Sequence, residues 1–159
     1  MWRAPAAPRA LVAALLAAAS AHGVSLFGFY SADLSATASY SNLFQADSVA
    51  DVQRAHAAGQ HALLLTYDAF FTSVPNRMVL RPDYAAAWDA LAAQAAPLLA
   101  DGSLWGFNLG DELVWNCLDP ANLTVAADAV RASFPTAVIW YNEATPPLER
   151  GIDSAATRA

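Results

Sequence analysis

The stretch LWGFNLGDELVWN, residues 104–116, constrains the fold more than any other part of the sequence. Its first half is apolar and aromatic, which is typical of a strand buried inside a parallel sheet. The pattern breaks at Gly110, and the adjacent acids Asp111 and Glu112 follow at once. This arrangement predicts a buried strand that ends in an acidic, chemically active edge.

Apolar runs alternate with helical patterns on both sides of this stretch. Ser48 and Asp51 have capping-box spacing, Gly59 is a natural helix stop, and Pro97 predicts a kink or break in a long helix. Strands that alternate with helices indicate parallel pairing and right-handed crossovers. The predicted strands cover 25–31, 38–45, 61–71, 104–110 and 136–144, and the predicted helices cover 47–60, 81–103 and 119–135.

Polar side chains follow four of the five predicted strands. In a parallel α/β domain the carboxyl ends of the strands meet at one edge, where sites form. A sheet does not need these polar side chains for its stability. Asp33 is, however, equally well explained as a helix cap, and Asp68 as a residue that hydrogen-bonds a loop. The set consists of Tyr30, Ser31, Asp33, Thr66, Tyr67, Asp68, Asn108, Asp111, Glu112, Tyr141, Asn142 and Glu143.

Strand alternation distinguishes the two adjacent acids. Side chains on a strand point to opposite faces with a period of two. The large residues Trp105, Phe107 and Leu109 form one set, and Gly106, Asn108 and Gly110 form the other. Continued past Gly110, this alternation predicts Glu112 over the site and Asp111 either pointing outward or in the loop. On the last strand, alternation leaves open whether the face of Tyr141 and Glu143 or that of Asn142 and Trp140 points inward.

Paired carboxylates at such an edge suit glycoside hydrolysis. One carboxyl donates a proton to the leaving oxygen, and a second acts as nucleophile or activates water. Trp115, next to the acids, is as well explained by sugar stacking as by core packing, whereas Trp140 and Trp105 are better explained by core packing. No HExxH, phosphate loop or GxSxG motif occurs. The sequence therefore predicts neither a cofactor nor a metal.

The first 21 residues have the order of a secretory signal peptide. Arg3 and Arg9 precede an apolar run over 10–19 and small residues around Ser20. We expect cleavage after Ala21, secretion, and no membrane span in the mature chain, the alternative being an uncleaved N-terminal anchor. The remaining six arginines face fourteen acids, a formal charge of −8, so nucleic acid is not an expected partner.

Two further features bear on a secreted protein. Asn122-Leu123-Thr124 is a sequon that predicts N-glycosylation of Asn122. Cys117 is the single cysteine, so it has no partner for a disulfide within the chain.

Four segments together resemble a known family. FGFYS…YSNLF, AHAAGQHALLLTYDAFF, LWGFNLGDEL and AVIWYNEA resemble the first part of glycoside-hydrolase-like (β/α)8 TIM barrels, over most of residues 26–144. In that family a strand reading roughly GFYLGDEP carries a carboxylate pair after strand four. The resemblance implies that Glu112 is the acid/base, although Leu113 stands where proline is usual.

The resulting prediction is a secreted glycoside hydrolase-like protein that acts on an oligo- or polysaccharide. We expect a signal peptide at 1–21, an incomplete TIM barrel of about five strands at 22–147, and an irregular tail at 148–159. The alternatives are a non-catalytic carbohydrate-binding pseudo-enzyme and an inactive barrel fragment. The predicted catalytic residues are Glu112, Asp111 and Glu143, and the predicted substrate-binding residues are Asp68, Asn108, Trp115, Tyr141, Asn142 and Tyr30.

Overall fold

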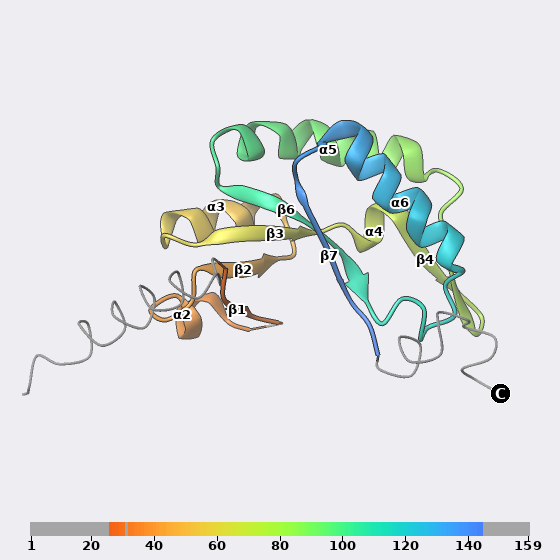
Figure 1. Cartoon of the computed structure of the whole chain (residues 1–159), viewed down its shortest axis with the longest axis horizontal. Coiled ribbons are helices and arrows are strands. Elements are labelled where there is room, and N and C mark those ends of the chain that lie inside the picture. Colours follow the sequence, from red (N-terminus) through yellow and green to blue (C-terminus); the bar gives the residue numbers. More distant parts are fainter. Residues whose placement is uncertain (1–25, 31, 145–159) are drawn as a thin grey trace, which may run out of the picture.

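Five parallel strands form the main sheet of the protein (Figure 1). The structure is a computed structural model that describes residues 26–30 and 32–144; the predicted signal peptide, Ser31 and the predicted tail lie outside the described residues. The sheet order is β1-β2-β3-β6-β7. Its strands are β1 (Gly28–Phe29), β2 (Leu43–Ala46), β3 (His61–Leu65), β6 (Leu104–Asp111) and β7 (Val138–Asn142).

The sheet is curved like half a barrel. Its two edge strands, β1 and β7, are not paired with each other. Even so, the ring of Tyr30, directly after β1, lies 5.8 Å from the ring of Trp140 on β7, centroid to centroid. Side chains from opposite edges can meet in this way only when the sheet bends around them, so one face is concave.

Helices cover the opposite, convex face. The longest are α3 (Val49–Ala57), α5 (Tyr84–Ala100) and α6 (Pro120–Ser133), and Figure 1 shows α5 and α6 side by side over β6. The predicted N-caps of α3 and α6 are confirmed: Ser48 Oγ accepts from the Asp51 amide at 3.2 Å, and the Asp119 carboxylate caps α6. Pro97 does not end α5, which continues to Ala100. None of the helices in the described ranges is long and apolar enough to cross a membrane.

The core lies between the convex face and these helices. Phe107 is fully buried, and its ring stacks on Phe134, the C-cap of α6, at 5.4 Å and meets Trp88 of α5 edge-on at 5.2 Å. Leu64 and Leu109 belong to the same buried cluster. Alternation along β3 and β6 therefore directs one side-chain set into this core and leaves the other set for the concave face.

The predicted fold class, a partial (β/α)8 barrel, is wrong. The structure is an open α/β half-barrel sheet together with a separate two-stranded antiparallel sheet, β4 (Phe71–Val74) and β5 (Arg77–Leu80). The described part of the chain contains five helices, including the short α2 (Leu34–Thr37) and α4 (Tyr67–Phe70). The apolar run 61–71 is accordingly not one strand, because β3 ends at Leu65.

The physical reason is a tight turn that interrupts the strand–helix alternation. Asn76 has a φ of 66°, in the left-handed region that asparagine tolerates well, and it follows Pro75 at the tip of the β4–β5 hairpin. The hairpin is joined to the loop after β6, since the Met78 amide donates to the Asn116 carbonyl at 3.0 Å. It therefore stands beside the carboxyl edge of the main sheet.

Candidate functional site

A bulge at the end of β6 determines the directions in which the adjacent acids Asp111 and Glu112 leave the strand. Strand β6 advances three residues from Asn108 to Asp111. Its partner β7 advances only two residues, from Trp140 to Asn142, over the same length of the ladder. Gly110 occupies this irregularity with a φ of 145°, and a Cβ there would lie 2.8 Å from the Leu113 side chain. The extra residue resets the alternation, as bulges do.

The reset places Asp111 on the concave side of the edge. Asp111 is opposite Asn142, and Asn142 shares its face of β7 with Trp140. The Asn142 Nδ2 atom donates to Asp111 Oδ1 at 2.6 Å. Neither predicted placement of Asp111, outward or in the loop, is found, because Asp111 is the last residue of β6 and simple alternation does not continue through Gly110. The structure does bring together the predicted site residues Asp111 and Asn142.

Glu112 has an unusual backbone that is held from both sides. Its φ is 48°, a left-handed conformation that costs a residue with a Cβ about 1–2 kcal/mol. Its amide donates to the Asn142 carbonyl at 2.8 Å, and its carbonyl accepts from the Asn116 amide at 2.8 Å and from Asn116 Nδ2 at 2.9 Å. These three bonds maintain the conformation.

The Glu112 side chain is half-buried. Within residues 26–30 and 32–144 its carboxylate has no hydrogen-bond or ion-pair partner. Among the described residues, the backbone of Glu112 is therefore held by hydrogen bonds while its carboxylate is not.

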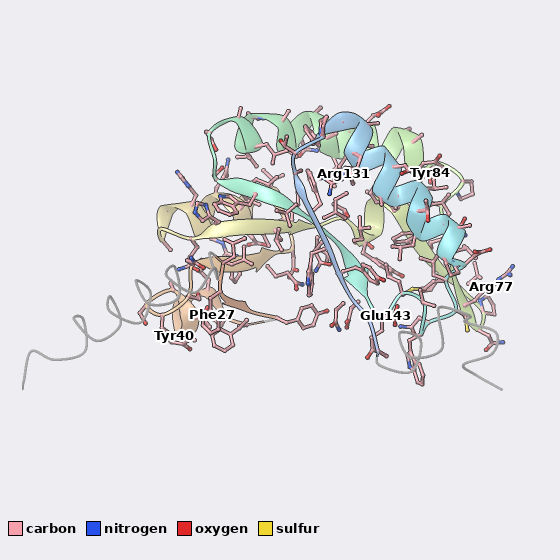
Figure 2. The ribbon with its side chains drawn as sticks, in the orientation of Figure 1. Phe27, Tyr40, Arg77, Tyr84, Arg131 and Glu143 are labelled. Atoms are coloured by element: carbon pink, nitrogen blue, oxygen red, sulfur yellow. The ribbon has the colours of Figure 1, made fainter. Side chains whose placement is uncertain are left out.

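Glu143 is the opposite case, because its carboxylate is fully engaged by the backbone. It accepts from the Val114 amide at 2.8 Å, the Trp115 amide at 3.2 Å and the Ala144 amide at 2.8 Å. Figure 2 shows Glu143 at the far end of β7, close to the loop that follows β6. These bonds make Glu143 a support of the loop that carries Glu112. Its predicted catalytic role stays a prediction.

The concave face contains a hollow of about 250 Å³. Its lining includes Tyr30 and Trp140, which are 45% and 37% exposed, together with Leu43, Gln45 and Leu63. Trp140 and Asn142 are two residues apart on the same face, so about 7 Å separates the hollow from the Asp111–Asn142 pair.

Within the described ranges, two buried side-chain polar atoms on this face lack hydrogen-bond partners. Asn108 is fully buried; its Oδ1 accepts from the Gly110 amide at 2.9 Å, but its Nδ2 has no acceptor. Gln45 Oε1, at the hollow, has no donor. Neither Gln45 nor the exposed position of Trp140 at the hollow followed from the sequence analysis. The only available signal was a glutamine inside the otherwise apolar strand 43–46.

The other predicted binding residues are dispersed. Tyr141 packs against the helix-side core, which answers the open question about β7: Ile139 and Tyr141 face the helices, and Trp140 faces the hollow. Asp68 is exposed on α4, and its backbone carbonyl accepts from Arg81 Nη1 at 2.9 Å. Trp115 is half-buried in the loop that Glu143 supports.

The remaining predicted features lie outside this edge. Asn122 is in the first turn of α6, and its predicted glycosylation stays a prediction. Asp33 is the N-cap of α2, where its carboxylate accepts from the Ser35 amide at 2.7 Å, so the cap interpretation is confirmed. Hydrogen bonds from Ser35 hold the pKa of Asp33 below its usual value.

Cys117 is half-buried with a φ of 62°. Among the described residues, no three His, Cys, Asp or Glu side chains are grouped so that they could hold a metal ion.

In the described part of the chain, the carboxyl edge thus combines the unpartnered carboxylate of Glu112, the amide-bound carboxylate of Glu143 and a hollow lined by Tyr30 and Trp140. Comparisons of the chain with protein-family models, with curated proteins and with solved structures found no match.

Proposed function

We propose that this protein binds a carbohydrate at the carboxyl edge of its sheet and cleaves a glycosidic bond, with Glu112 as general acid/base. The observation that carries the proposal is the state of Glu112: a left-handed backbone held by three hydrogen bonds, with a half-buried carboxylate that is free of partners among the described residues. Strained backbone of this kind clusters at functional sites, where the surrounding structure maintains it.

Glycoside hydrolysis also needs a second carboxylate. Glu143 is engaged by three backbone amides, which leaves Asp111 as the better candidate on this edge. Asp111 is exposed on the concave side and is oriented by its bond from Asn142 Nδ2. In this proposal Asn142 is a positioning residue, because it acts on the substrate only through Asp111.

The aromatic pair supports a sugar as the ligand. Tyr30 and Trp140 are more than one-third exposed and lie on the concave side. Aromatic rings combine a large apolar face with a polar edge, and the C–H faces of sugar rings pack on such surfaces. The similarity of LWGFNLGDEL to the acid-bearing strand of glycoside hydrolases points in the same direction.

A second candidate is a carbohydrate-binding protein without catalysis. The engagement of Glu143 favours this candidate, because it removes one of the three acids at the edge from proton transfer. The two candidates share the sugar site and differ only in whether Glu112 transfers a proton.

The test is a comparison of Glu112→Gln with the wild-type chain on a panel of chromogenic glycosides and soluble polysaccharides. Glutamine keeps the size of glutamate but cannot deliver a proton, so we expect turnover to fall by about 10²–10⁴-fold with sugar binding retained. Asp89→Asn, which changes an exposed acid on α5, is the matched control. Equal turnover in wild type and Glu112→Gln would remove Glu112 from the mechanism, and binding without turnover by wild type would favour the second candidate.

We also propose that the mature protein is secreted, on the signal-peptide pattern of residues 1–21. Expression in a eukaryotic secretory host, followed by N-terminal sequencing, is expected to give His22 as the first residue. An intracellular product that retains Met1 would contradict this proposal. Loss of mass on treatment with an N-glycanase, absent in Asn122→Gln, would establish the glycan.

A further inference from the structure

We propose that Asn116 is a positioning residue for Glu112 and that it orients this acid without contacting the sugar itself. Asn116 donates twice to the Glu112 carbonyl, from its backbone amide at 2.8 Å and from its Nδ2 atom at 2.9 Å. This inference rests on the proposed function, which it deepens by naming the residue that controls how Glu112 is presented to a substrate.

The turn that carries Asn116 is closed at its C-terminal end. The Leu118 amide donates to the Leu113 carbonyl at 3.0 Å, and the Cys117 amide donates to the Val114 carbonyl at 2.9 Å. Cys117 has a φ of 62°, so these two bonds form a Schellman motif around a left-handed residue. Leu113 and Leu118 are fully buried in the helix-side core cluster, which fixes this end of the turn.

The N-terminal end of the same turn is held by Glu143. Its carboxylate accepts from the Val114 amide at 2.8 Å and from the Trp115 amide at 3.2 Å. The turn is therefore fixed at both ends by bonds in which Glu112 takes no part. Glu112 precedes the turn with a φ of 48°, and its own backbone bonds have to hold it in that conformation.

The Glu112 backbone is bonded to the sheet on one side and to the turn on the other. Its amide donates to the Asn142 carbonyl at 2.8 Å, at the end of β7. Its carbonyl accepts both donors of Asn116, so one residue holds the C-terminal side of Glu112. A change in the φ of Glu112 would redirect its side chain and strain these bonds, so the direction of the acid depends on Asn116.

Asn116 is itself anchored by the β4–β5 hairpin. Its carbonyl accepts from the Met78 amide at 3.0 Å, and Met78 packs against the helix-side core cluster. Three polar groups of Asn116 are thus engaged, its amide and Nδ2 by Glu112 and its carbonyl by Met78. The hairpin therefore supports the acid through Asn116.

The side-chain chemistry of asparagine makes this arrangement testable. The Nδ2 atom is a donor, whereas both oxygens of an ionised carboxylate are acceptors. Asn116→Asp keeps the size and shape of the side chain but turns an acceptor toward the Glu112 carbonyl oxygen in place of the donor. The substitution therefore removes the positioning bond without creating a cavity.

The first measurement is the turnover of Asn116→Asp, in the full chain at pH 7, on a 4-nitrophenyl glycoside that the wild type cleaves. We expect kcat to fall about 10–100-fold, because a displacement of about 1 Å is enough to misplace an acid, and KM to stay within about twofold. Asn76→Asp makes the same change at the exposed tip of the hairpin, where φ is 66°, and it should leave both constants unchanged.

The second measurement does not depend on turnover. A residue with a positive φ has its amide and Hα protons close together, so it gives a strong intraresidue cross-peak in a NOESY spectrum. We expect the cross-peak of Glu112 to weaken in Asn116→Asp and that of Cys117 to persist, because the Schellman motif does not use the Asn116 side chain. Asn116→Ala, which removes the donor without adding a charge, replaces Asn116→Asp if that variant does not fold.

The outcomes separate this inference from the proposed function. A weaker Glu112 cross-peak together with a lower kcat and a constant KM would support the positioning role. An unchanged kcat or an unchanged Glu112 cross-peak would overturn it, and loss of both cross-peaks would make Asn116 a general support of the turn instead. If the wild type cleaves no glycoside, the proposed function fails, and the cross-peaks still show whether Asn116 holds the Glu112 backbone.

Discussion

The two faces of the sheet differ in how their buried side chains are accommodated, although the same strands contribute side chains to both faces. On the convex face Phe107 is completely buried between Trp88 and Phe134. Its neighbour Asn108 is equally buried but faces the concave side, where its Nδ2 has no partner. Among the described residues, the two buried side-chain polar atoms without a hydrogen-bond partner, Gln45 Oε1 and Asn108 Nδ2, both belong to the concave side, which also exposes Tyr30 and Trp140.

The comparison indicates where stability and function reside. A buried polar group without a partner is costly, and a sheet selected only for stability would avoid it. Such groups are tolerated where a water molecule, an ion or a ligand satisfies them. We therefore expect the convex face to determine the free energy of unfolding and the concave face to determine binding.

The largest expected effect is Phe107→Ala. Removing a fully buried aromatic side chain should lower the free energy of unfolding by about 3–5 kcal/mol. Trp140→Ala, on the other face, should cost about 1 kcal/mol or less, because the ring is already 37% exposed. Urea unfolding followed by far-UV circular dichroism measures both. Equal costs would remove the distinction between the faces.

The second effect concerns the loop between the faces. Glu143→Ala leaves the Val114 and Trp115 amides without their acceptor and should cost about 1–3 kcal/mol. Hydrogen exchange of these two amides should accelerate, while that of Leu64 on β3 follows global unfolding. Asp111→Asn is the control, because its bond from Asn142 Nδ2 is at an exposed site. Unchanged exchange at Val114 would mean that Glu143 does not support the loop.

Much of the convex side was predictable because its signals are local. Ser48 and Asp119 act as caps within a few residues of their own positions, and Trp88 lies on a helical stripe. The concave side depends on register between strands far apart in the sequence. The bulge at Gly110, which turns Asp111 inward, is visible only once β6 is paired with β7.

The β4–β5 hairpin shows a different limit. The run 61–71 is continuously apolar, and periodicity alone does not separate one long buried strand from a strand, a helical turn and another strand. Pro75 and Asn76 were the available turn signal. That hairpin, with the unpaired edges of the half-barrel sheet, is why the fold class differs from the one expected.

A third, smaller effect should raise stability. Glu112→Gly removes the Cβ from a left-handed position and should increase the free energy of unfolding by about 1 kcal/mol while abolishing turnover. Asn76→Gly is the matched control, because asparagine tolerates a φ of 66° and the gain should be only a few tenths of a kcal/mol. If Glu112→Gly is destabilising, the conformation of Glu112 is not maintained against strain, and the main support for its role is lost.

The smallest effect is the pH dependence of the helix-covered face. The Arg54 hydrogen bond, assisted by Ser48, holds the pKa of Asp51 below its usual value. Because the folded pKa is depressed, the stabilisation is complete above the unfolded pKa of about 3.9 and disappears as pH falls through the folded value. Asp51→Asn should therefore cost a few tenths of a kcal/mol at pH 7 and nothing near pH 2. Asp128→Asn, at an exposed position of α6, is the control for net charge. If the stability cost of Asp51→Asn persists at pH 2, that cost arises from the cap geometry at α3 and not from the charge of Asp51. The acid sensitivity of the convex face would then be due to other carboxylates.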